Sequence, residues 1–333
     1  MRRAALALLV LAGAVWTTAA PSILHAQRPV FPAAPDPATE ALELIPVQGK
    51  VWLLAGAGGN ISVQVGDDGI VLVDTGLEAF SQRVLDTLAR LTDRPVRMII
   101  NTGTALDHIG GNDAISRTGQ GLYVAANSGA VTFPEAQIVG HERAVLQLSR
   151  LTGPRAVPQR QWPFDTFFGD LKTVVASGEP IEIHHLPAAR TDGDLMVFFR
   201  GSDVIAAGDV FDTTSYPRVD ADAGGTIQGV LDALNRIIRI TVPTFNQMGG
   251  TRVIPGHGRI SNESDVVEYR DMVTIVRDRI RLLVEAGTSL AEVRAAGVTR
   301  DYDGIYGSTT GPWTTDMFVE AVYREEVRRS GSR

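Results

Sequence analysis

Four short segments of the chain carry the carboxylate and imidazole side chains from which a metal site could be built. They are residues 101–112, 187–194, 208–209 and 255–258. Each lies at the end of an apolar stretch or at the start of a loop, where a rigid scaffold usually presents ligands. The chain contains no cysteine, so a metal ion would have to be held by histidine, aspartate and glutamate side chains. Metal ligation is therefore the chemistry that the sequence indicates most strongly.

Other kinds of active site have little support in the sequence. Ser215 and Ser261 lack the Gly-x-Ser-x-Gly context of a nucleophile elbow. The glycine-rich turn at 56–59 precedes a strand pattern, whereas a dinucleotide-binding turn opens a helix. The sequence has no Gly-x-x-x-x-Gly-Lys-Ser/Thr loop for binding phosphates.

The spacing of apolar residues predicts the elements that would position these segments. Strand patterns occur at residues 51–54, 61–65, 70–73, 96–100, 122–125, 173–176, 181–183, 196–199, 204–207 and 253–254. Helical patterns occur at residues 80–91, 144–151, 227–238 and 266–286, after the capping-box pattern at 289–292, and around 318–323. Two groups of strands accompanied by helices predict two β-sheets covered by helices, an α/β sandwich.

Taken in order, these segments resemble the motif series of the metallo-β-lactamase superfamily. The series begins with Asp74-Thr75-Gly76 and continues through 101–112, where the family has His-x-His-x-Asp-His between Asn-Thr and Gly-Gly-Asn. It ends with an Asp after Gly and with Pro-Gly-His, which are residues 208–209 and 255–257 here. The resemblance covers about residues 51–258 and implies an αββα sandwich, to which the later helices add a C-terminal extension.

The chain departs from the family pattern in one half of the metal site. The family holds its first metal with three histidines, and the corresponding positions here are Gly103, Ala105 and Arg190. None of these residues can bind zinc through its side chain. Glycine and alanine have no donor atom, and arginine stays cationic at ordinary pH. The sequence therefore predicts that the first half of the site is lost.

The other half of the pattern is complete. The resemblance assigns Asp107, His108 and His257 to the second metal, with Asp209 bridging both metals in the family, and all four residues are present. Two imidazoles and two carboxylates suit zinc, and also iron or manganese. We therefore expect one divalent ion, zinc as first choice, bound by these four residues.

A site with one metal leads to a hydrolase hypothesis. A metal ion brings the pKa of a bound water down toward about 7, which allows hydrolysis of an ester, lactone, amide or similar bond. We expect Asp107 to take part, and Arg190 to supply positive charge near the lost half-site while pairing with Asp209. β-Lactam hydrolysis at two zinc ions is not expected. The alternative is a binding protein without catalytic activity that keeps the fold and at most one structural ion.

The candidate residues also have structural interpretations. Asp107 would cap a helix start, and His257 between two glycines would be a loop residue. Asp74 would be a turn residue or the hydrogen-bond partner of a ligating histidine.

The remaining histidines and carboxylates are expected to be structural. His184 and His185 are adjacent on a strand, so their side chains face opposite ways. His141 heads a predicted helix and is interpreted as a surface or capping residue. Asp192 and Asp194 belong to a Thr-Asp-Gly-Asp turn and are interpreted as structural.

The first residues predict export. Arg2 and Arg3 precede an apolar run at 4–15 that is too short to span a bilayer, and Ala26 stands at a cleavage position. The second choice of cleavage site is after Ala20, and the alternative to cleavage is an uncleaved anchor. We expect residues 1–26 to be a signal peptide and the protein to be periplasmic or secreted, with no membrane span after cleavage.

The rest of the chain divides into three parts. Residues 27–45 are rich in proline and alanine, which predicts a linker. We expect residues 46–262 to form the metallo-β-lactamase-like domain and residues 263–333 to form its helical extension. The net charge of −7 disfavours nucleic acid as a partner and leaves a small molecule.

Two regions are expected to line a substrate pocket, residues 129–170 and 211–226. The first contains four aromatic residues, Trp162, Phe164, Phe167 and Phe168. They would form either an apolar substrate wall or a packed lid.

Overall fold

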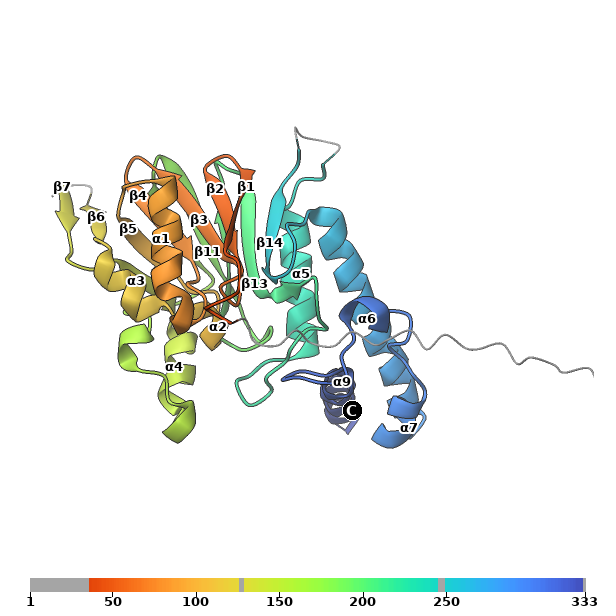
Figure 1. Cartoon of the computed structure of the whole chain (residues 1–333). Coiled ribbons are helices and arrows are strands. Elements are labelled where there is room, and N and C mark those ends of the chain that lie inside the picture. The colour runs from red at the N-terminus through yellow and green to blue at the C-terminus, as the bar shows by residue number, and fades with distance from the viewer. Residues whose placement is uncertain (1–35, 126–128, 245–248, 332–333) are drawn as a thin grey trace, which may run out of the picture.

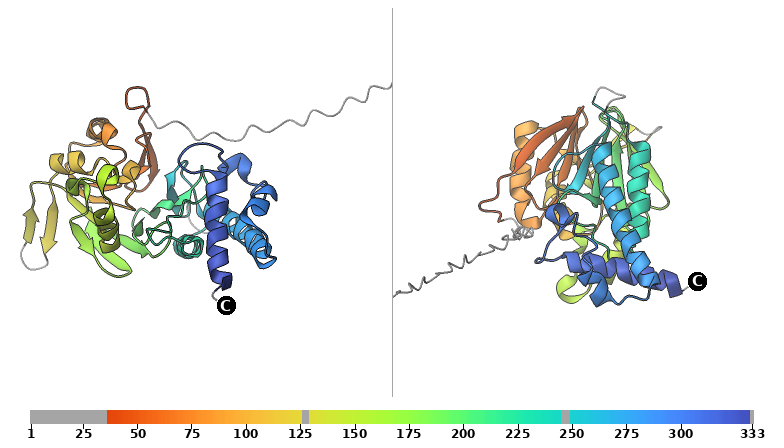
Figure 2. Two further views of the ribbon diagram at one scale, coloured as in Figure 1. Left: turned by 90° about the horizontal axis from the view of Figure 1, so that it is seen from below. Right: turned by 90° about the vertical axis from the view of Figure 1, so that its right-hand side faces the viewer.

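The computed structural model describes residues 36–125, 129–244 and 249–331. The predicted signal peptide and residues 27–35 of the predicted linker lie outside the described residues. Two β-sheets face each other, and helices cover the outer face of each sheet (Figure 1). The αββα sandwich expected from the sequence is confirmed. The right-hand view of Figure 2 shows the layers side by side, with α1 on one flank and α5 and α6 on the other.

The first sheet has the strand order β1-β2-β3-β4-β5-β8-β9. Its strands are β1 (Glu43–Gln48), β2 (Val51–Ala55), β3 (Ile61–Gly66), β4 (Gly69–Val73), β5 (Val96–Ile100), β8 (Gln137–His141) and β9 (Asp165–Phe167). Strands β1 to β4 form an antiparallel meander, and β4, β5, β8 and β9 run parallel. Strand β1 begins inside the predicted linker, because Ile45 pairs with Leu53 and packs into the core between the sheets.

The second sheet has the order β10-β11-β12-β13-β14. Its strands are β10 (Leu171–Ala176), β11 (Glu179–Leu186), β12 (Asp194–Phe199), β13 (Val204–Asp212) and β14 (Arg252–His257). The first four strands are antiparallel, and β14 returns parallel to β13. Inward-facing aliphatic residues of both sheets, such as Val71, Ile100, Val197 and Ala206, form the core between them.

Helices complete the two outer layers. On the first sheet, a 3-10 turn (Glu78–Phe80) leads into α1 (Ser81–Leu91), which packs beside α3 (Asn112–Thr118). On the second sheet lie α5 (Ile227–Ile240) and α6 (Glu263–Glu285). The apolar stripes of these helices face the sheets, which is why the sequence showed helical spacing there.

The C-terminal helices extend the second outer layer. They are α7 (Leu290–Ala295), α8 (Asp303–Tyr306) and α9 (Thr315–Gly331). The predicted capping box opens α7, where Ser289 and Glu292 bond each other's backbone. Phe318 and Val322 of α9 join the same apolar cluster as α5 and α6. The extension therefore shares a core with the second sheet.

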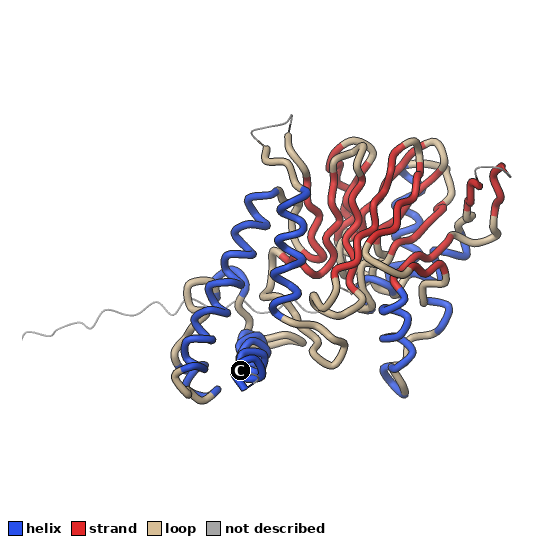
Figure 3. The backbone as a smooth tube through the Cα atoms, turned by 180° about the vertical axis from the view of Figure 1, so that it is seen from behind, coloured by secondary structure: helices blue, strands red, loops and turns tan. Residues whose placement is uncertain are grey.

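The remaining elements connect the layers. They are α2 (Leu106–Ile109), the hairpin β6 (Leu122–Ala125) and β7 (Gly129–Thr132), α4 (Glu142–Arg150) and 3-10 turns at Gly153–Arg155 and Gln159–Gln161. Figure 3 shows the hairpin standing apart from both sheets. Within the described part of the chain, no helix combines the length and the apolar character that crossing a membrane requires.

Candidate metal centre

The candidate site forms where the strand ends of both sheets meet. Asp74 follows β4, and Asp107 and His108 lie in α2, shortly after β5. Asp209 lies in β13, and His257 is the last residue of β14. Because β4 runs parallel to β5 and β13 parallel to β14, each pair delivers its residues to one edge of its sheet. Segments that are far apart in the sequence thus converge.

Asp74 orients His108. The Asp74 backbone has a positive φ of 66°, a conformation that aspartate tolerates better than most residues. Its carboxylate accepts hydrogen bonds from Thr102 N at 2.8 Å and Thr102 Oγ1 at 2.6 Å. The same carboxylate contacts Nδ1 of His108 at 2.7 Å. The predicted role of Asp74 as the partner of a histidine is confirmed.

Two glycines allow the backbone to approach the site. A Cβ on Gly59 would lie 2.9 Å from the Asp107 carbonyl oxygen and 2.9 Å from Cε1 of His108. A Cβ on Gly256 would lie 2.4 Å from Oδ1 of Asp209. Real Cβ atoms do not approach other atoms so closely, so glycine is needed at both positions for these side chains to keep their places.

The four predicted metal-binding side chains lie together. Nε2 of His108 is 2.9 Å from Oδ1 of Asp209. Nε2 of His257 is 3.2 Å from Oδ2 of Asp107 and 3.5 Å from Oδ1 of Asp209. Among the described residues, one group has three ligand atoms all within 4.8 Å of one another, and its members are Asp107, His108 and His257. Asp209 contacts both histidines of this group.

The spacing fits a divalent ion. An ion with tetrahedral bonds of about 2.0–2.1 Å to nitrogen or oxygen places its ligand atoms about 3.3 Å apart, and the observed separations run from 2.9 to 3.5 Å. The carboxylate of Asp74 on Nδ1 of His108 leaves Nε2 for an ion, as in many metal sites. Oδ2 of Asp209 is buried without a hydrogen bond from any described residue. The residues present are therefore able to hold a metal.

Mutual contacts set the charges of these groups. Burial opposes the charged form of His108, but Asp209 and Asp74 outweigh burial and raise its pKa well above the ordinary value. Burial likewise opposes the charged form of His257, and Asp107 and Asp209 raise its pKa. Burial tends to raise the pKa of both carboxyl groups. His257 and His108 nevertheless lower the pKa of Asp107, and His108 and Arg190 lower the pKa of Asp209. Without an ion, the cluster is a network of paired charges.

An ion pair lies beside Gly103, in the half of the site that the sequence predicts to be lost. Nη1 of Arg190 lies 3.0 Å from Oδ2 of Asp209, so the predicted pairing is present. The contact lacks hydrogen-bond geometry, which leaves Oδ2 without a donor. A Cβ on Gly103 would lie 3.5 Å from Oδ1 of Asp194 and 3.9 Å from Nη1 of Arg190. A guanidinium and a carboxylate thus lie beside the position where the family has a histidine.

Asp194 has a larger part than the sequence indicated. Its carboxylate accepts hydrogen bonds from Thr191 N at 2.7 Å and Thr191 Oγ1 at 2.9 Å, as a structural residue would. Burial raises the pKa of Asp194 to about 6, although the charge of Arg190 acts in the opposite direction. Asp209 and Asp194 also raise the pKa of Arg190 against the effect of its burial. No sequence signal distinguished this role of Asp194 from an ordinary turn.

Two structural interpretations of the site residues are wrong. Asp107 does not cap α2, whose N-cap is Ala105 without a side-chain hydrogen bond, because the Asp107 carboxylate is directed to His257. His257 is not a loop residue, because β14 continues through Pro255 and Gly256 to reach it.

The other histidines lie outside the cluster. His184 bonds Arg236 at 3.0 Å, and Nε2 of His185 donates to the Asp192 carbonyl at 2.8 Å. His141 caps α4, as one interpretation held, by accepting from Arg143 N. A surface position for His141 is wrong, since it is 2% exposed and its ring stacks on that of His185 at 3.7 Å. The stacking joins β8 to β11 across the sandwich, which the sequence could not show.

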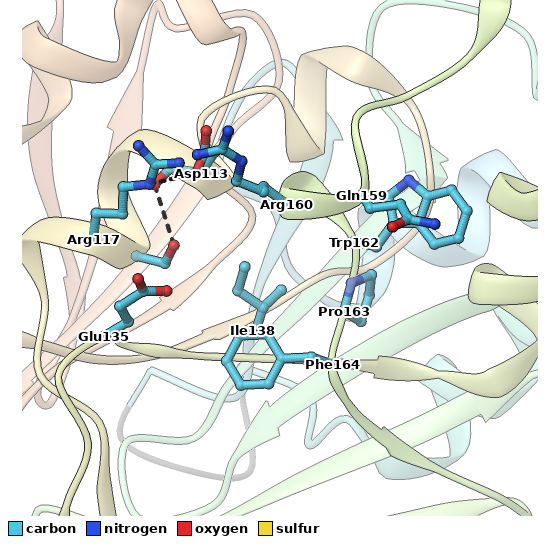
Figure 4. A pocket seen from close by; sticks show the side chains of 10 residues that line it. Asp113, Arg117, Glu135, Ile138, Gln159, Arg160, Trp162, Pro163 and Phe164 are labelled. Atoms are coloured by element: carbon cyan, nitrogen blue, oxygen red, sulfur yellow. Dashed lines mark hydrogen bonds and ion pairs between the residues drawn. The ribbon is translucent and has the colours of Figure 1, made fainter.

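The aromatic residues after 160 divide into two groups. Trp162 packs against Ile109, Leu148 and Val157, and Phe167 is buried. Phe164 and Phe168 are exposed, by 61% and 72%. Trp162 and Phe164 line a pocket beside α3, none of whose lining residues belongs to the metal cluster (Figure 4).

The loop at 213–226 connects the site to the C-terminal extension. The Tyr216 ring stacks on Phe318 of α9 at 4.6 Å, and its hydroxyl donates to Asp303 at 3.0 Å. Further along, Asp220 N donates to the carbonyl of Arg190 at 2.9 Å. The extension therefore supports the segment that carries Arg190. Apart from the apolar character of the two rings, no feature of the sequence indicated this contact.

Comparisons with known proteins agree with this architecture. A family model described as the metallo-beta-lactamase superfamily matches residues 54–264. A search of curated protein sequences finds no significant match.

Solved structures show a similar fold. The stereoselective inverting sec-alkylsulfatase Pisa1 from Pseudomonas sp. matches with a TM-score of 0.63 and 14% identity, over 88% of this chain and 52% of that one. The chain thus spans about half the length of the alkylsulfatase. The BLEG-1 B3 metallo-beta-lactamase matches with a TM-score of 0.50 and 20% identity, over 70% of this chain and 100% of its own. A metallo-beta-lactamase from Pontibacter korlensis gives 0.50 and 17%, over 70% and 99%.

Proposed function

Because the chain belongs to the metallo-beta-lactamase superfamily, we propose that it is an exported hydrolase that uses one divalent metal ion, zinc as first choice. The substrate would be a small molecule with an ester, lactone, amide or similar bond. Export rests on the basic residues and the apolar run at the start of the sequence. Asp107, His108, Asp209 and His257 would hold the ion.

One observation carries the proposal: the ligand atoms of Asp107, His108 and His257 all lie within 4.8 Å of one another, and Asp209 contacts both histidines. A bound divalent ion activates water for attack on a carbonyl or similar centre. Asp107 and His257 are 25% and 27% exposed, so the cluster is accessible from solvent. His108 and Asp209 lie deeper, at 2% and 9%. The buried pair would fix the ion, and the exposed pair would border the substrate.

Arg190 would stabilise negative charge on the substrate. Its guanidinium has five N–H donors and, among the described residues, makes one contact with a carboxylate and no side-chain hydrogen bond. It is held beside Asp209 and is 14% exposed. Donors placed in advance where negative charge develops are a large part of catalysis in hydrolases.

The second candidate is a binding protein without catalytic activity. The observation that favours it is the charge pairing of the cluster. His108 lies between Asp74 and Asp209, His257 contacts Asp107, and Arg190 contacts Asp209. These contacts pair the charged groups with one another without an ion, as expected of a protein that binds no metal.

The test is the metal content of the mature protein, purified without chelator and measured by inductively coupled plasma mass spectrometry. We expect about one equivalent in the wild type and in Asp93→Asn, an exposed control outside the site, and loss of the ion in His257→Ala. A screen of esters, lactones, amides and, in view of the similar alkylsulfatase fold, alkyl sulfates would follow. An ion without turnover of any class would favour the binding protein. No ion after incubation with excess zinc, iron or manganese would contradict both the metal site and the hydrolase.

A further inference from the structure

The pocket beside α3 is separate from the metal centre and has the features of a ligand site. It has a volume of about 510 Å³, within the range of small-molecule sites. Figure 4 shows charged side chains of Asp113, Arg117, Arg160 and Glu135 gathered at one end, with Ile138 and Phe164 next to them. An apolar surface thus adjoins a charged one.

The walls of this pocket are fixed by hydrogen bonds. Asn112 Nδ2 donates to the carbonyl of Gln161 at 2.7 Å, and Trp162 Nε1 donates to the carbonyl of Val157 at 2.9 Å. Phe164 N donates to the carbonyl of Ile138 at 3.0 Å. The segment from 159 to 164 is therefore tied to α3 and to β8, and the pocket exists before any ligand binds. A preformed site saves the cost of ordering its walls.

The apolar part of the pocket is only partly covered. Phe164 is 61% exposed and lies against Ile138, which is itself buried. A second flat ring stacked on Phe164 would remove apolar surface from water and gain the favourable contact of an aromatic pair. This part of the pocket is therefore complementary to a ligand with an aromatic or large apolar side chain.

The charged part holds one free cation and one free anion. Arg117 is paired with Asp113 at 2.8 Å. Among the described residues, the side chains of Arg160 and Glu135 have no hydrogen-bond or ion-pair partner. A free guanidinium is complementary to a carboxylate, and a free carboxylate to an ammonium group. Opposite free charges next to an apolar surface match a zwitterion with an apolar side chain.

We propose that this pocket binds a small zwitterion that carries an aromatic or large apolar side chain, either a free amino acid or a dipeptide. Its carboxylate would pair with Arg160, its ammonium group with Glu135, and its side chain would cover Phe164. The proposal does not depend on the metal centre, because no residue of the cluster lines the pocket.

The test is titration of the full mature protein, by calorimetry and ligand-observed NMR, with four probes. Phenylalanine carries both charges, N-acetylphenylalanine only the carboxylate, phenylalaninamide only the ammonium group, and diphenylalanine has the charges further apart. We expect binding with a Kd between about 0.1 and 1 mM for the better of the two zwitterions, since exposed charge pairs contribute little each. That probe identifies whether an amino acid or a dipeptide is the ligand.

Variants assign the contacts. Phe164→Ala should weaken binding of every probe about tenfold. Arg160→Gln should weaken phenylalanine and N-acetylphenylalanine about threefold and leave phenylalaninamide unchanged, whereas Glu135→Gln should show the reverse preference. Arg155→Gln, an exposed arginine outside the pocket, is the matched control and should change nothing. The proposal is overturned if the wild type binds neither zwitterion at 10 mM, or if Arg155→Gln weakens binding as much as Arg160→Gln.

Discussion

The two halves of the candidate metal centre have the same scaffold and opposite contents. In one half, the ligand atoms of Asp107, His108 and His257 point at one another across 4.8 Å or less. In the other half, Gly103 has no side chain and the ion pair of Arg190 with Asp209 lies beside it. Gly103 follows the same strand, β5, as Asp107 and His108, whereas Arg190 comes from the connection between the antiparallel strands β11 and β12.

This difference illustrates how a cationic side chain can pair with buried carboxylates near a candidate metal site. A bound cation neutralises the carboxylates around it, and buried carboxylates without a partner are costly. Arg190 supplies a positive charge that is covalently part of the protein. Asp209 and Asp194 are the two carboxylates that raise its pKa most. The protein itself thus provides a cation in one half, and the other half keeps the geometry for a free ion.

Removal of His108 is expected to have the largest effect on stability. His108→Ala leaves Asp74 and Asp209 buried without their shared partner, and the loss of one member of a buried charge network costs about 3–5 kcal/mol. Urea unfolding in the presence of a chelator should show this decrease in the free energy of unfolding. His257→Ala, at a position 27% exposed, is the control and should lose much less stability. Equal losses in both variants would contradict the difference in burial on which the argument rests.

Asp74→Asn tests the carboxylate behind the ligand. Asparagine also tolerates the positive φ of this position, so the substitution removes the charge and keeps the backbone. Zinc affinity should fall about 10- to 100-fold, as when the hydrogen-bond partner of a ligating histidine is lost. Competition with a fluorescent chelator measures it. An affinity equal to that of Asp93→Asn would show that Asp74 does not tune the ion.

Arg190→Gln tests the half of the site that contains the ion pair of Arg190 with Asp209. The substitution removes a cation 3.0 Å from Asp209, so Asp209 is free for the ion and a repulsive charge disappears. We expect zinc affinity to rise about tenfold in the same competition assay, with Arg155→Gln unchanged. A weaker affinity in Arg190→Gln would mean that Arg190 positions Asp209 for the metal and does not compete with it.

The smallest effect concerns two glycines, one in each half. Gly59→Ala would bring a Cβ to 2.9 Å from Cε1 of His108, and overpacking of this kind costs about 1 kcal/mol or more. Gly103→Ala places its Cβ no closer than 3.5 Å to Asp194, an ordinary contact, and should be near neutral. Thermal unfolding of the two variants compares them. Equal destabilisation of the two variants would contradict the finding that a Cβ fits at Gly103 without close contacts.

Much of the fold could be predicted because local patterns report burial directly. The alternation in 61–65 and the helical spacing in 227–238 correspond to β3 and α5, and the capping box at Ser289 opens α7. Such patterns fail where burial comes from a distant part of the chain. Strand β1 begins within the proline-rich segment because it pairs with β2, and His141 is buried because His185 stacks on it.

The sequence shows which residues are available to build the site. It contained Asp107, His108, Asp209 and His257 near predicted strand ends, no cysteine, and an arginine at a position to which the resemblance assigns a histidine. Residue type alone fixes these conclusions, because a glycine or an arginine side chain cannot bind zinc wherever it lies.

The tertiary structure alone arranges these residues in space. It placed Asp74 on Nδ1 of His108, directed Arg190 to Asp209, and brought Asp194 beside Gly103. It also separated the pocket at Phe164 from the metal cluster. These outcomes depend on the register and packing of strands far apart in the sequence, and on distances of about 3 Å at which charges and hydrogen bonds act.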